Sequence, residues 1–440
     1  MPSMAASTLI SPAELHRTGA GALLVALSGG LDSVVLLHAL ASMPEARARG
    51  LRAVHVHHGL HADADRWTAH CQHTCEALGI ALRSARVSVA RDGGEGIEAA
   101  ARRARHAVFA SELGDDEVLV IAHHRDDQAE TFLLRALRAS GPDGLGAMQA
   151  WRRYGHGWLW RPLLAQPRSA LQAFAQAQQL QWIDDPSNDD TAFDRNFLRH
   201  RVLPLLRERW PQAEATLARS AQLCAADAAL LAADDARALA KVSARDAHVL
   251  DAHALRLLAP ARRARVLRAW VVQLGLPALP GHAIERIERE LLHARSDAQA
   301  EFAWRDARIE AWRETLFADR LRPSLSPDWN VDWDGSAPLA LPDGGRLQLL
   351  GARGFAVPLR VHARHGGERL HLGGRAHRHL LKHLLQEHAV PPWDRRHLPL
   401  LSDPGGELLA VADVIQAGSF ERWLREHDAH LRWERPRHVV

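Results

Sequence analysis

A glycine loop between two apolar runs is the first segment whose residue types could do chemistry. Residues 28–33 read Ser-Gly-Gly-Leu-Asp-Ser, after an apolar run at 21–27 and before another at 34–40. This order predicts a buried strand, a tight turn and a helix, so backbone N–H groups and the positive helix end converge on one point. Such a point binds phosphate, and Asp32 adds a carboxylate that can hold Mg²⁺ against a polyphosphate. The loop has no lysine and is not a Walker A loop; the alternative is an ordinary glycine turn that closes a strand.

A pair of carboxylates forms the second candidate. Residues 122–131 read Ala-His-His-Arg-Asp-Asp-Gln-Ala-Glu-Thr and follow a predicted strand at 117–122. Asp127 and Glu130 are three residues apart, which puts both carboxylates on one side of a helix. Two carboxylates there can share a metal, bind an amine or accept a proton. The alternative is helix capping, with Asp126 or Asp127 as N-cap and Glu130 as capping-box partner. Capping explains only one of the acids, so we favour a functional role.

Two basic clusters are weaker candidates. Residues 194–201 place Arg195 and Arg199 on one or two helical turns, beside an acidic turn at 184–190. In residues 96–105 a glutamate and several arginines recur at helical spacing. Taken alone, both clusters are explained by ion pairs on solvated helix faces, which contribute little free energy. A basic face of this kind can also meet RNA phosphates.

The cysteines favour a structural role. Cys71 and Cys75 lie with two histidines in residues 70–75, but inside a predicted amphipathic helix and without Cys-x-x-Cys spacing. We therefore expect buried structural cysteines rather than a zinc site. With Cys224 they form an odd and sparse set, which argues against a disulfide framework and favours a reducing compartment.

The elements that must position these clusters alternate between strand and helix in the first half of the chain. Such alternation predicts a doubly wound parallel sheet with helices on both faces, that is, an α/β fold. Ligands bind at the carboxyl ends of the strands in such sheets, and the glycine loop, His57–His61 and His123–Glu130 all fall there. Strands are expected at 22–27, 52–57, 82–89 and 117–122, helices at 32–42, 63–78, 95–113, 126–139, 167–179 and 194–209, and a glycine-rich connection at 141–162.

Changes of amino-acid composition further along the chain predict two more domains. The middle of the chain is rich in Ala, Leu and Arg, with an amphipathic helix at 281–294 and strands at 300–318. After residue 326 Pro and Gly rise, and short alternating runs at 346–350 and 357–361 suggest strands. We expect an α/β catalytic domain at 1–211, a mostly helical domain at 212–325 and a small α+β domain at 326–440.

The bulk composition is that of a globular protein. The chain has 440 residues, 47% of them hydrophobic and 24% charged, which is enough for several cores. Almost all of the positively charged residues are arginine, a residue suited to phosphate and base recognition. For the overall composition we favour codon bias in a GC-rich genome as the explanation, so the case for a nucleic-acid partner depends on clusters. The sequence shows no charged leader with an apolar core and no apolar run of about 20 residues. We therefore expect a cytoplasmic protein without a membrane segment.

Together these segments resemble the tRNA(Ile)-lysidine synthetase family of the PP-loop ATP pyrophosphatase superfamily. The glycine loop alone identifies only the superfamily, whereas the set of motifs in this order is specific to the family. Besides the segments above, the resemblance rests on 56–60, 141–145, 161–164, 185–188, 195–199, 366–369, 382–385, 391–395 and 398–400. It covers nearly the whole chain.

The resemblance implies an ATP-dependent carbon–nitrogen ligase that joins free L-lysine to the wobble cytidine of the CAU anticodon of tRNA(Ile). The cytidine is first adenylated, and the modified tRNA decodes AUA as isoleucine. ATP, Mg²⁺, L-lysine and tRNA(Ile) are thus implied, and the oligomeric state stays open. By resemblance the catalytic set is Asp32, Asp127, Glu130 and Arg199, with Asp127 and Glu130 handling lysine, Asp32 holding Mg²⁺, and Ser28, Gly29, Gly30, Leu31, Asp32 and Ser33 holding ATP.

The resemblance also assigns the other domains. The middle domain helps to place the anticodon loop, and the last domain meets the acceptor arm of the tRNA. Related chains are lysine-rich near 378–384, where this chain has mainly arginine and histidine. Two alternatives follow: phosphate attraction there is weaker, or Arg375 and Arg378 take it over. Trp393, after two prolines, is expected to pack on proline in the core.

Two other classes of protein fit some of the pattern. Related tRNA thiolases of the PP-loop superfamily commonly use Cys-x-x-Cys pairs, and the sequence has none. A non-enzymatic RNA-binding protein with a decayed nucleotide loop is the other alternative. The intact residues 28–33, together with Asp127 and Glu130, argue against it.

Overall fold

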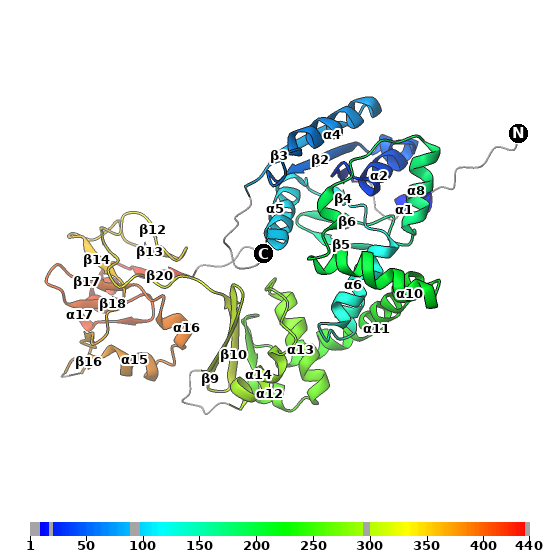
Figure 1. Cartoon of the computed structure of the whole chain (residues 1–440). Coiled ribbons are helices and arrows are strands. Elements are labelled where there is room, and N and C mark those ends of the chain that lie inside the picture. The colour runs from blue at the N-terminus through cyan, green and yellow to red at the C-terminus, as the bar shows by residue number, and fades with distance from the viewer. Residues whose placement is uncertain (1–8, 17–20, 89–96, 294–299, 376, 436–440) are drawn as a thin grey trace, which may run out of the picture. The chain divides into compact units, whose positions relative to one another are not determined.

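The computed structural model describes residues 9–16, 21–88, 97–293, 300–375 and 377–435 (Figure 1). The chain divides into two compact units, Met1–Leu231 and Ala232–Val440. The boundary falls inside the long helix α11 (Ala213–Val242). The division into three domains at 1–211, 212–325 and 326–440 stays a prediction.

A mixed sheet forms the centre of the first unit. In the described residues its order is β3-β2-β1-β4-β6-β5, with every neighbouring pair parallel except β5 with β6 at one edge. The predicted doubly wound sheet is therefore confirmed. The strands are β1 (Leu23–Ala26), β2 (Leu51–His57), β3 (Ala81–Arg86), β4 (Val118–Val120), β5 (Trp151–Tyr154) and β6 (Gly157–Trp160).

Helices cover both faces of this sheet because its strand residues alternate between two apolar cores. Leu23 and Val25 of β1 join a core with α2, α4 and α8, whereas Leu24 joins a second core with Phe109 of α5. Buried parallel strands of this kind are apolar throughout. The helices of the unit are α1 (Pro12–His16), α2 (Leu31–Ala41), α3 (Pro44–Ala48), α4 (Ala64–Leu78), α5 (Ile97–Glu112), α6 (Arg125–Ala136), α7 (Pro142–Leu145) and α8 (Arg168–Ala177).

The prediction of a glycine-rich connection at 141–162 is wrong. This segment forms α7 and the β5–β6 hairpin, and Leu159 of β6 pairs in parallel with Leu119 of β4. Trp151 and Trp160 stack across the hairpin with ring centroids 5.3 Å apart. A Cβ atom on Gly157 would lie 2.1 Å from the Glu117 carbonyl oxygen, so glycine is needed where the two strands meet.

The basic segment at 194–209 is helical as predicted, but it is not a regular α-helix. It consists of α9 (Asp194–Phe197), a π-helical turn η2 (Leu198–Val202) and α10 (Leu203–Arg209). A 3₁₀ turn, η1 (Pro186–Asp189), lies in the acidic segment that precedes it.

The second unit begins with helices packed on an antiparallel sheet. Within the described ranges this sheet has the order β7-β10-β9-β8, and the strands expected at 300–318 are confirmed, whereas β7 was not expected. The elements are β7 (Val249–Asp251), α12 (Ala252–Arg256), α13 (Pro260–Gln273), α14 (Ala283–Arg286), the π-helical turn η3 (Ile287–Leu292), β8 (Ala300–Trp304), β9 (Ala307–Trp312) and β10 (Thr315–Arg320). The helix expected at 281–294 thus corresponds to α14 and η3, and residue 294 lies outside the described residues.

The remainder of the second unit is rich in β-structure, as predicted. Among its described residues, a larger sheet has the order β11-β14-β17-β18-β15-β16 with β19 on β18, and a smaller sheet has the order β12-β13-β20. The strands are β11 (Asn330–Trp333), β12 (Leu339–Ala340), β13 (Arg346–Leu350), β14 (Leu359–His362), β15 (Arg369–Leu370), β16 (His379–Leu380), β17 (Leu400–Ser402), β18 (Leu408–Val411), β19 (Ile415–Gln416) and β20 (His430–Glu434). The helices are α15 (Leu381–Glu387), α16 (Pro392–Arg395) and α17 (Gly418–Glu426).

Trp393 of α16 is buried as predicted, and its packing on proline stays a prediction. Its ring stacks on Phe317 of β10, with centroids 4.5 Å apart and planes at 6°, and meets Trp312 edge-on. Of the helices in the described ranges, none combines the length and the apolar character that crossing a bilayer requires.

Candidate active site

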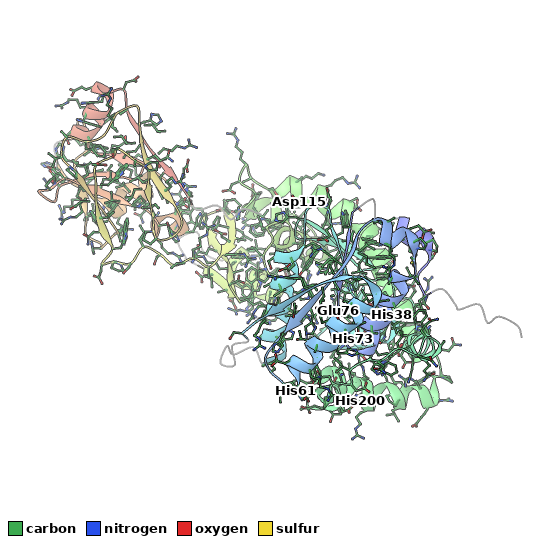
Figure 2. The ribbon with its side chains drawn as sticks, turned by 90° about the horizontal axis from the view of Figure 1, so that it is seen from above. His38, His61, His73, Glu76, Asp115 and His200 are labelled. Atoms are coloured by element: carbon green, nitrogen blue, oxygen red, sulfur yellow. The ribbon has the colours of Figure 1, made fainter. Side chains whose placement is uncertain are left out.

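A cavity of about 690 Å³ opens at the carboxyl ends of β1, β2 and β4. It brings together side chains from three segments that the sequence singled out. His61, labelled in Figure 2, lines it from the loop after β2 and stacks on Trp67. The lining residues that carry the argument below are Ser28, Asp32, Ser33, Asp127, Arg195 and Arg199.

The glycine loop has the expected strand–turn–helix form. Gly29 has φ +89°, and a Cβ atom there would lie 2.7 Å from Cδ1 of Ile183 and 3.1 Å from Sγ of Cys71, so the turn needs glycine. The hydroxyls of Ser28 and Ser33 lie 3.0 Å apart, and Ser33 Oγ donates to the Gly30 carbonyl oxygen. These contacts fix the loop, while the first N–H groups of α2 have no partner within the helix and remain suited to phosphate.

Asp32 stands in the first turn of α2 and lines the cavity. Its Oδ1 atom is buried and accepts no hydrogen bond from the described residues. A buried carboxylate oxygen without a partner is costly, and a cation bound there would satisfy it. No group of three or more His, Cys, Asp or Glu side chains within the described ranges is arranged to hold a metal. A single carboxylate beside a loop suited to phosphate fits Mg²⁺, because this ion commonly takes one or two carboxylates together with phosphate and water oxygens.

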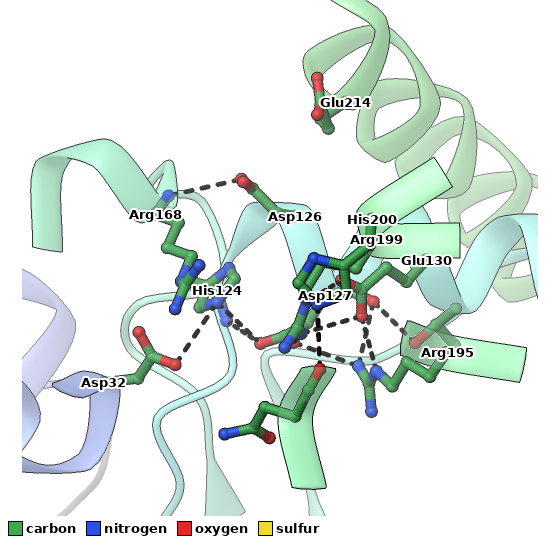
Figure 3. Close-up of polar contacts among 12 residues, drawn as sticks. Asp32, His124, Asp126, Asp127, Glu130, Arg168, Arg195, Arg199, His200 and Glu214 are labelled. Atoms are coloured by element: carbon green, nitrogen blue, oxygen red, sulfur yellow. Dashed lines mark hydrogen bonds and ion pairs between the residues drawn. The ribbon is translucent and has the colours of Figure 1, made fainter. Parts of the chain in front are cut away.

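His124 links Asp32 to the carboxylate pair (Figure 3). It is fully buried, and its Nε2 atom lies 3.6 Å from Asp32 Oδ2 and 3.4 Å from Asp127 Oδ2. Burial alone would lower the pKa of His124, but the negative charges of Asp32 and Asp127 outweigh it and raise the pKa. The buried ring thus lies between two acids, and neither of its nitrogens has a hydrogen-bond partner among the described residues.

Helix capping occurs at α6, but not in the predicted form. The N-cap residue is His124, and its backbone N–H donates to Oδ2 of Asp127 at 2.9 Å. Asp127 is thus the capping-box partner, so the alternative reading of this segment, with Asp126 or Asp127 as N-cap and Glu130 as partner, does not describe α6. Capping occupies only one oxygen of Asp127, and the side chain still lines the cavity.

Four charged side chains form a closed network beside the cavity (Figure 3). Nε of Arg195 donates to Oε2 of Glu130 at 2.6 Å, and Nε of Arg199 donates to Oε1 at 2.7 Å. Both guanidinium groups also donate to Oδ1 of Asp127 at 3.2 Å. As expected, the two carboxylates lie on one side of α6, but both oxygens of the fully buried Glu130 are already bound. Glu130 therefore holds the arginines, and Asp127 is the acid that faces the cavity.

Two members of this site were not singled out as functional by the sequence reasoning. Arg195 precedes Arg199 by four residues, so the same helical spacing that pairs Asp127 with Glu130 was available as a signal. His124 directly follows a strand that ends at the ligand edge of the sheet. Its link to Asp32 depends on tertiary structure and carries no local signal.

Two other histidines that line the cavity, His58 and His123, have lowered pKa values. Burial, together with the charge of Arg105, lowers the pKa of His58 to about 4. Burial lowers the pKa of His123 to about 3, and its Nδ1 accepts a hydrogen bond from Arg161 Nε at 3.0 Å. Arg102 and Arg105 of α5 line the same cavity; Gly96, which precedes this helix, lies outside the described residues.

The cysteine prediction is confirmed. Cys71 and Cys75 are both buried in α4, and burial raises the pKa of their thiols to about 12 and about 11. Neither lines the cavity, and thiols with such pKa values are poor nucleophiles and metal ligands at neutral pH. This is evidence against the thiolase alternative.

The ionisation of Asp127 gives the protein a measurable acid sensitivity. Burial would raise the pKa of Asp127, but the charges of His124 and Arg195 and the hydrogen bond from His124 lower it to about 2. A lowered pKa in the folded state stabilises the fold above the unfolded pKa and loses that contribution as pH falls. We expect wild type to lose about 1 kcal/mol more free energy of unfolding than Asp127→Asn between pH 5 and pH 3. Urea unfolding at the two pH values measures this, and equal losses would contradict the assignment.

The first strand of the parallel sheet runs through a glycine turn into a helix that carries an acid. This is the architecture of PP-loop proteins, and the PP-loop domain matches residues 5–206. The TilS substrate binding domain matches residues 250–317, and the TilS substrate C-terminal domain matches residues 359–433. Three relatives carry the name tRNA(Ile)-lysidine synthase. The one from Xanthomonas axonopodis pv. citri is 54% identical over 95% of both chains. Those from Xylella fastidiosa (strain Temecula1) and Pseudomonas aeruginosa are 53% and 44% identical, over 93% and 99% of this chain and 94% and 98% of theirs. This chain belongs to the tRNA(Ile)-lysidine synthase family.

Proposed function

We propose that this chain ligates free L-lysine to the wobble cytidine of tRNA(Ile) with the anticodon CAU, and that ATP is cleaved to AMP and diphosphate. One observation carries the proposal. A single cavity joins the phosphate-binding loop, Asp32 and the Asp127 network in a chain of this family. We place the reaction in the cytoplasm, where tRNA, ATP and lysine are present together.

In the first step the cytidine carbonyl oxygen attacks the α-phosphate of ATP, and diphosphate leaves. Negative charge grows on phosphate oxygens, and donors fixed in advance stabilise it because they need not reorganise. The loop at Ser28–Ser33 supplies such donors from its backbone and from the start of α2. Asp32, with its unsatisfied Oδ1, is the residue that would hold Mg²⁺. When bound, that ion neutralises phosphate charge.

In the second step the ε-amine of lysine attacks the adenylated ring carbon, and AMP leaves. The amine starts as an ammonium ion, so a carboxylate must bind it and a base must accept its proton before it attacks. Asp127 is ionised and faces the cavity, and we assign to it the binding of the lysine ammonium. Arg199 lines the cavity and can neutralise the departing phosphate, and Glu130 acts through the two arginines that it holds.

The proposal is tested by the mass of the tRNA product. Purified protein is incubated with ATP, Mg²⁺, isotope-labelled lysine and unmodified tRNA(Ile), and the anticodon fragment is analysed by mass spectrometry. We expect one lysine per tRNA, with release of AMP and diphosphate in equal amounts. The matched control is the same tRNA with uridine at the wobble position, which should gain no label. Failure to label the cytidine tRNA would contradict the proposal.

The remaining domains are proposed to position the tRNA, with the middle domain helping to place the anticodon loop and the last domain binding the acceptor arm. Arg375 and Arg378 pair with Glu387 at 2.8 Å and with Glu407 at 3.0 Å. Exposed pairs of this kind contribute little free energy, so a phosphate can replace the carboxylates.

Asp32→Asn is expected to lower the rate of ATP cleavage about 100-fold, because the amide removes the charge opposite the cation. The Mg²⁺ concentration for half-maximal activity should rise as well. ATP–diphosphate exchange measured across a Mg²⁺ titration tests both effects. Asp115→Asn is the control, since Asp115 is exposed, does not line the cavity and is labelled in Figure 2. An unchanged Mg²⁺ requirement in Asp32→Asn would remove Asp32 from the metal site.

A further inference from the structure

Phe193 is a large apolar residue that is exposed at the cavity. It precedes α9 as its N-cap residue and lines the same cavity as Asp32 and Asp127. Even so, 38% of its surface is exposed. Among the described residues its ring has no aromatic partner, unlike Phe109 or Phe317. An exposed aromatic face at a substrate cavity marks a binding surface rather than a packing residue.

The backbone that carries Phe193 is fixed by hydrogen bonds. The Phe193 N–H donates to the Asp190 carbonyl oxygen at 3.3 Å, and its own carbonyl oxygen accepts from the Phe197 N–H at 2.9 Å. The side-chain amide of Asn196 donates to the carbonyl oxygens of Ser187 and Asp190, both at 2.9 Å. The ring therefore sits on a pre-organised support, which lowers the entropy cost of binding a partner.

The position of Phe193 in the chain indicates which substrate it meets. Two residues later, Arg195 contacts Glu130 and Asp127, and Asp127 is the acid to which we assign lysine. ATP phosphates belong to the glycine loop, and the reacting cytosine must lie between the α-phosphate and the lysine amine. A ring on the lysine side of the cavity is thus placed to meet a base of the tRNA rather than the adenine of ATP.

We propose that Phe193 is a stacking platform for an unpaired base of the anticodon loop and holds the target cytosine at the cavity. The inference rests on the proposed function and adds to it a residue that binds the base. A nucleobase stacks on an aromatic face whatever its hydrogen-bonding pattern, and loss of one such contact weakens binding roughly 5- to 150-fold.

The test compares substitutions that separate aromatic stacking from apolar bulk. We expect Phe193→Ala and Phe193→Leu to raise the KM for tRNA about 10-fold or more, because both remove the flat ring. Phe193→Trp should stay within about threefold of wild type, since it restores a ring that can stack. The KM for ATP should not change in any of them.

Phe197→Ala is the matched control. Phe197 lies one helical turn further along and is 49% exposed, but it does not line the cavity. Its loss should change the KM for tRNA less than twofold. An equal effect of Phe197→Ala would make Phe193 merely a member of a general apolar surface and overturn the proposal. A tRNA KM within twofold of wild type in Phe193→Leu, or a rise in the ATP KM instead, would overturn it too.

Two further measurements keep the inference separate from the proposed function. Thermal unfolding of each variant shows whether the fold is intact, and the exposure of Phe193 predicts unchanged curves. Direct binding of an RNA stem-loop with a CAU loop is measured in the absence of lysine. If wild type makes no lysidine, the proposed function fails, and stem-loop binding by Phe193→Leu and Phe193→Trp still decides the role of the ring.

Discussion

Asp127→Asn is expected to leave the fold intact and to reduce lysidine formation about 1,000-fold or more, because asparagine keeps the shape but not the charge. Its amide oxygen can still accept the hydrogen bond from the His124 N–H. The ammonium of lysine, however, loses the one ionised acid of the network that faces the cavity. Adenylation of the tRNA uses the glycine loop and Asp32, so it should continue.

The measurement is lysine incorporation into tRNA beside ATP–diphosphate exchange on the same preparation. Loss of incorporation with exchange retained is the expected pattern. Asp194→Asn is the control, because Asp194 is exposed and pairs only loosely with Arg138 at 3.8 Å. Turnover close to wild type in Asp127→Asn would refute the assignment of lysine to this acid.

Glu130→Gln is expected to lower the free energy of unfolding by about 3 kcal/mol, because it removes a fully buried charge that two partly buried guanidinium groups share. Both carboxylate oxygens of Glu130 accept hydrogen bonds from Nε atoms, at 2.6 and 2.7 Å. The neutral amide presents an NH₂ group to at least one of the cations. Since Arg199 would then lose its fixed position, lysidine formation should fall about 100-fold.

Urea unfolding provides the measurement. The control is Glu290→Gln, which removes a surface partner of Arg286 and Arg289, at 2.9 and 2.8 Å, and should lower the free energy of unfolding much less. Arg199→Gln alone and in combination with Glu130→Gln completes a double-mutant cycle. If the two substitutions add without coupling, the network does not act as a unit and the stability argument is wrong.

Much of the fold followed from the alternation of apolar runs, because a parallel sheet buries its strands on both faces. The β5–β6 hairpin, which the sequence analysis did not predict, shows where the alternation of apolar runs stops being informative. The strands β5 and β6 have four residues each and are rich in tryptophan and arginine, so their pattern lacks the apolar run that marks β1 or β2. Their pairing depends on the close approach at Gly157.

The candidate site was predictable where its residues are neighbours in sequence. The glycine loop and the spacing of Asp127 and Glu130 are local features. The structure confirms the strand–turn–helix form of the loop and the position of both carboxylates on one side of α6. The ion pairs that occupy both oxygens of Glu130 are not a local feature of the sequence. The partners Arg195 and Arg199 follow Glu130 by 65 and 69 residues, and only folding brings them to the same carboxylate. The roles assigned to these residues stay predictions.

The π-helical turn between α9 and α10 has a consequence for how this segment tolerates change. Leu198 and Leu203 are both buried, and the Leu203 N–H donates to the Leu198 carbonyl oxygen five residues earlier. In a regular α-helix two such residues would point about 140° apart, so one leucine would leave the core. The wider turn keeps the two leucines in phase, while Arg195 before the turn and Arg199 within it reach Glu130. Deleting a single residue between them would rotate α10 against α9, and we expect that to be less tolerated than any substitution there.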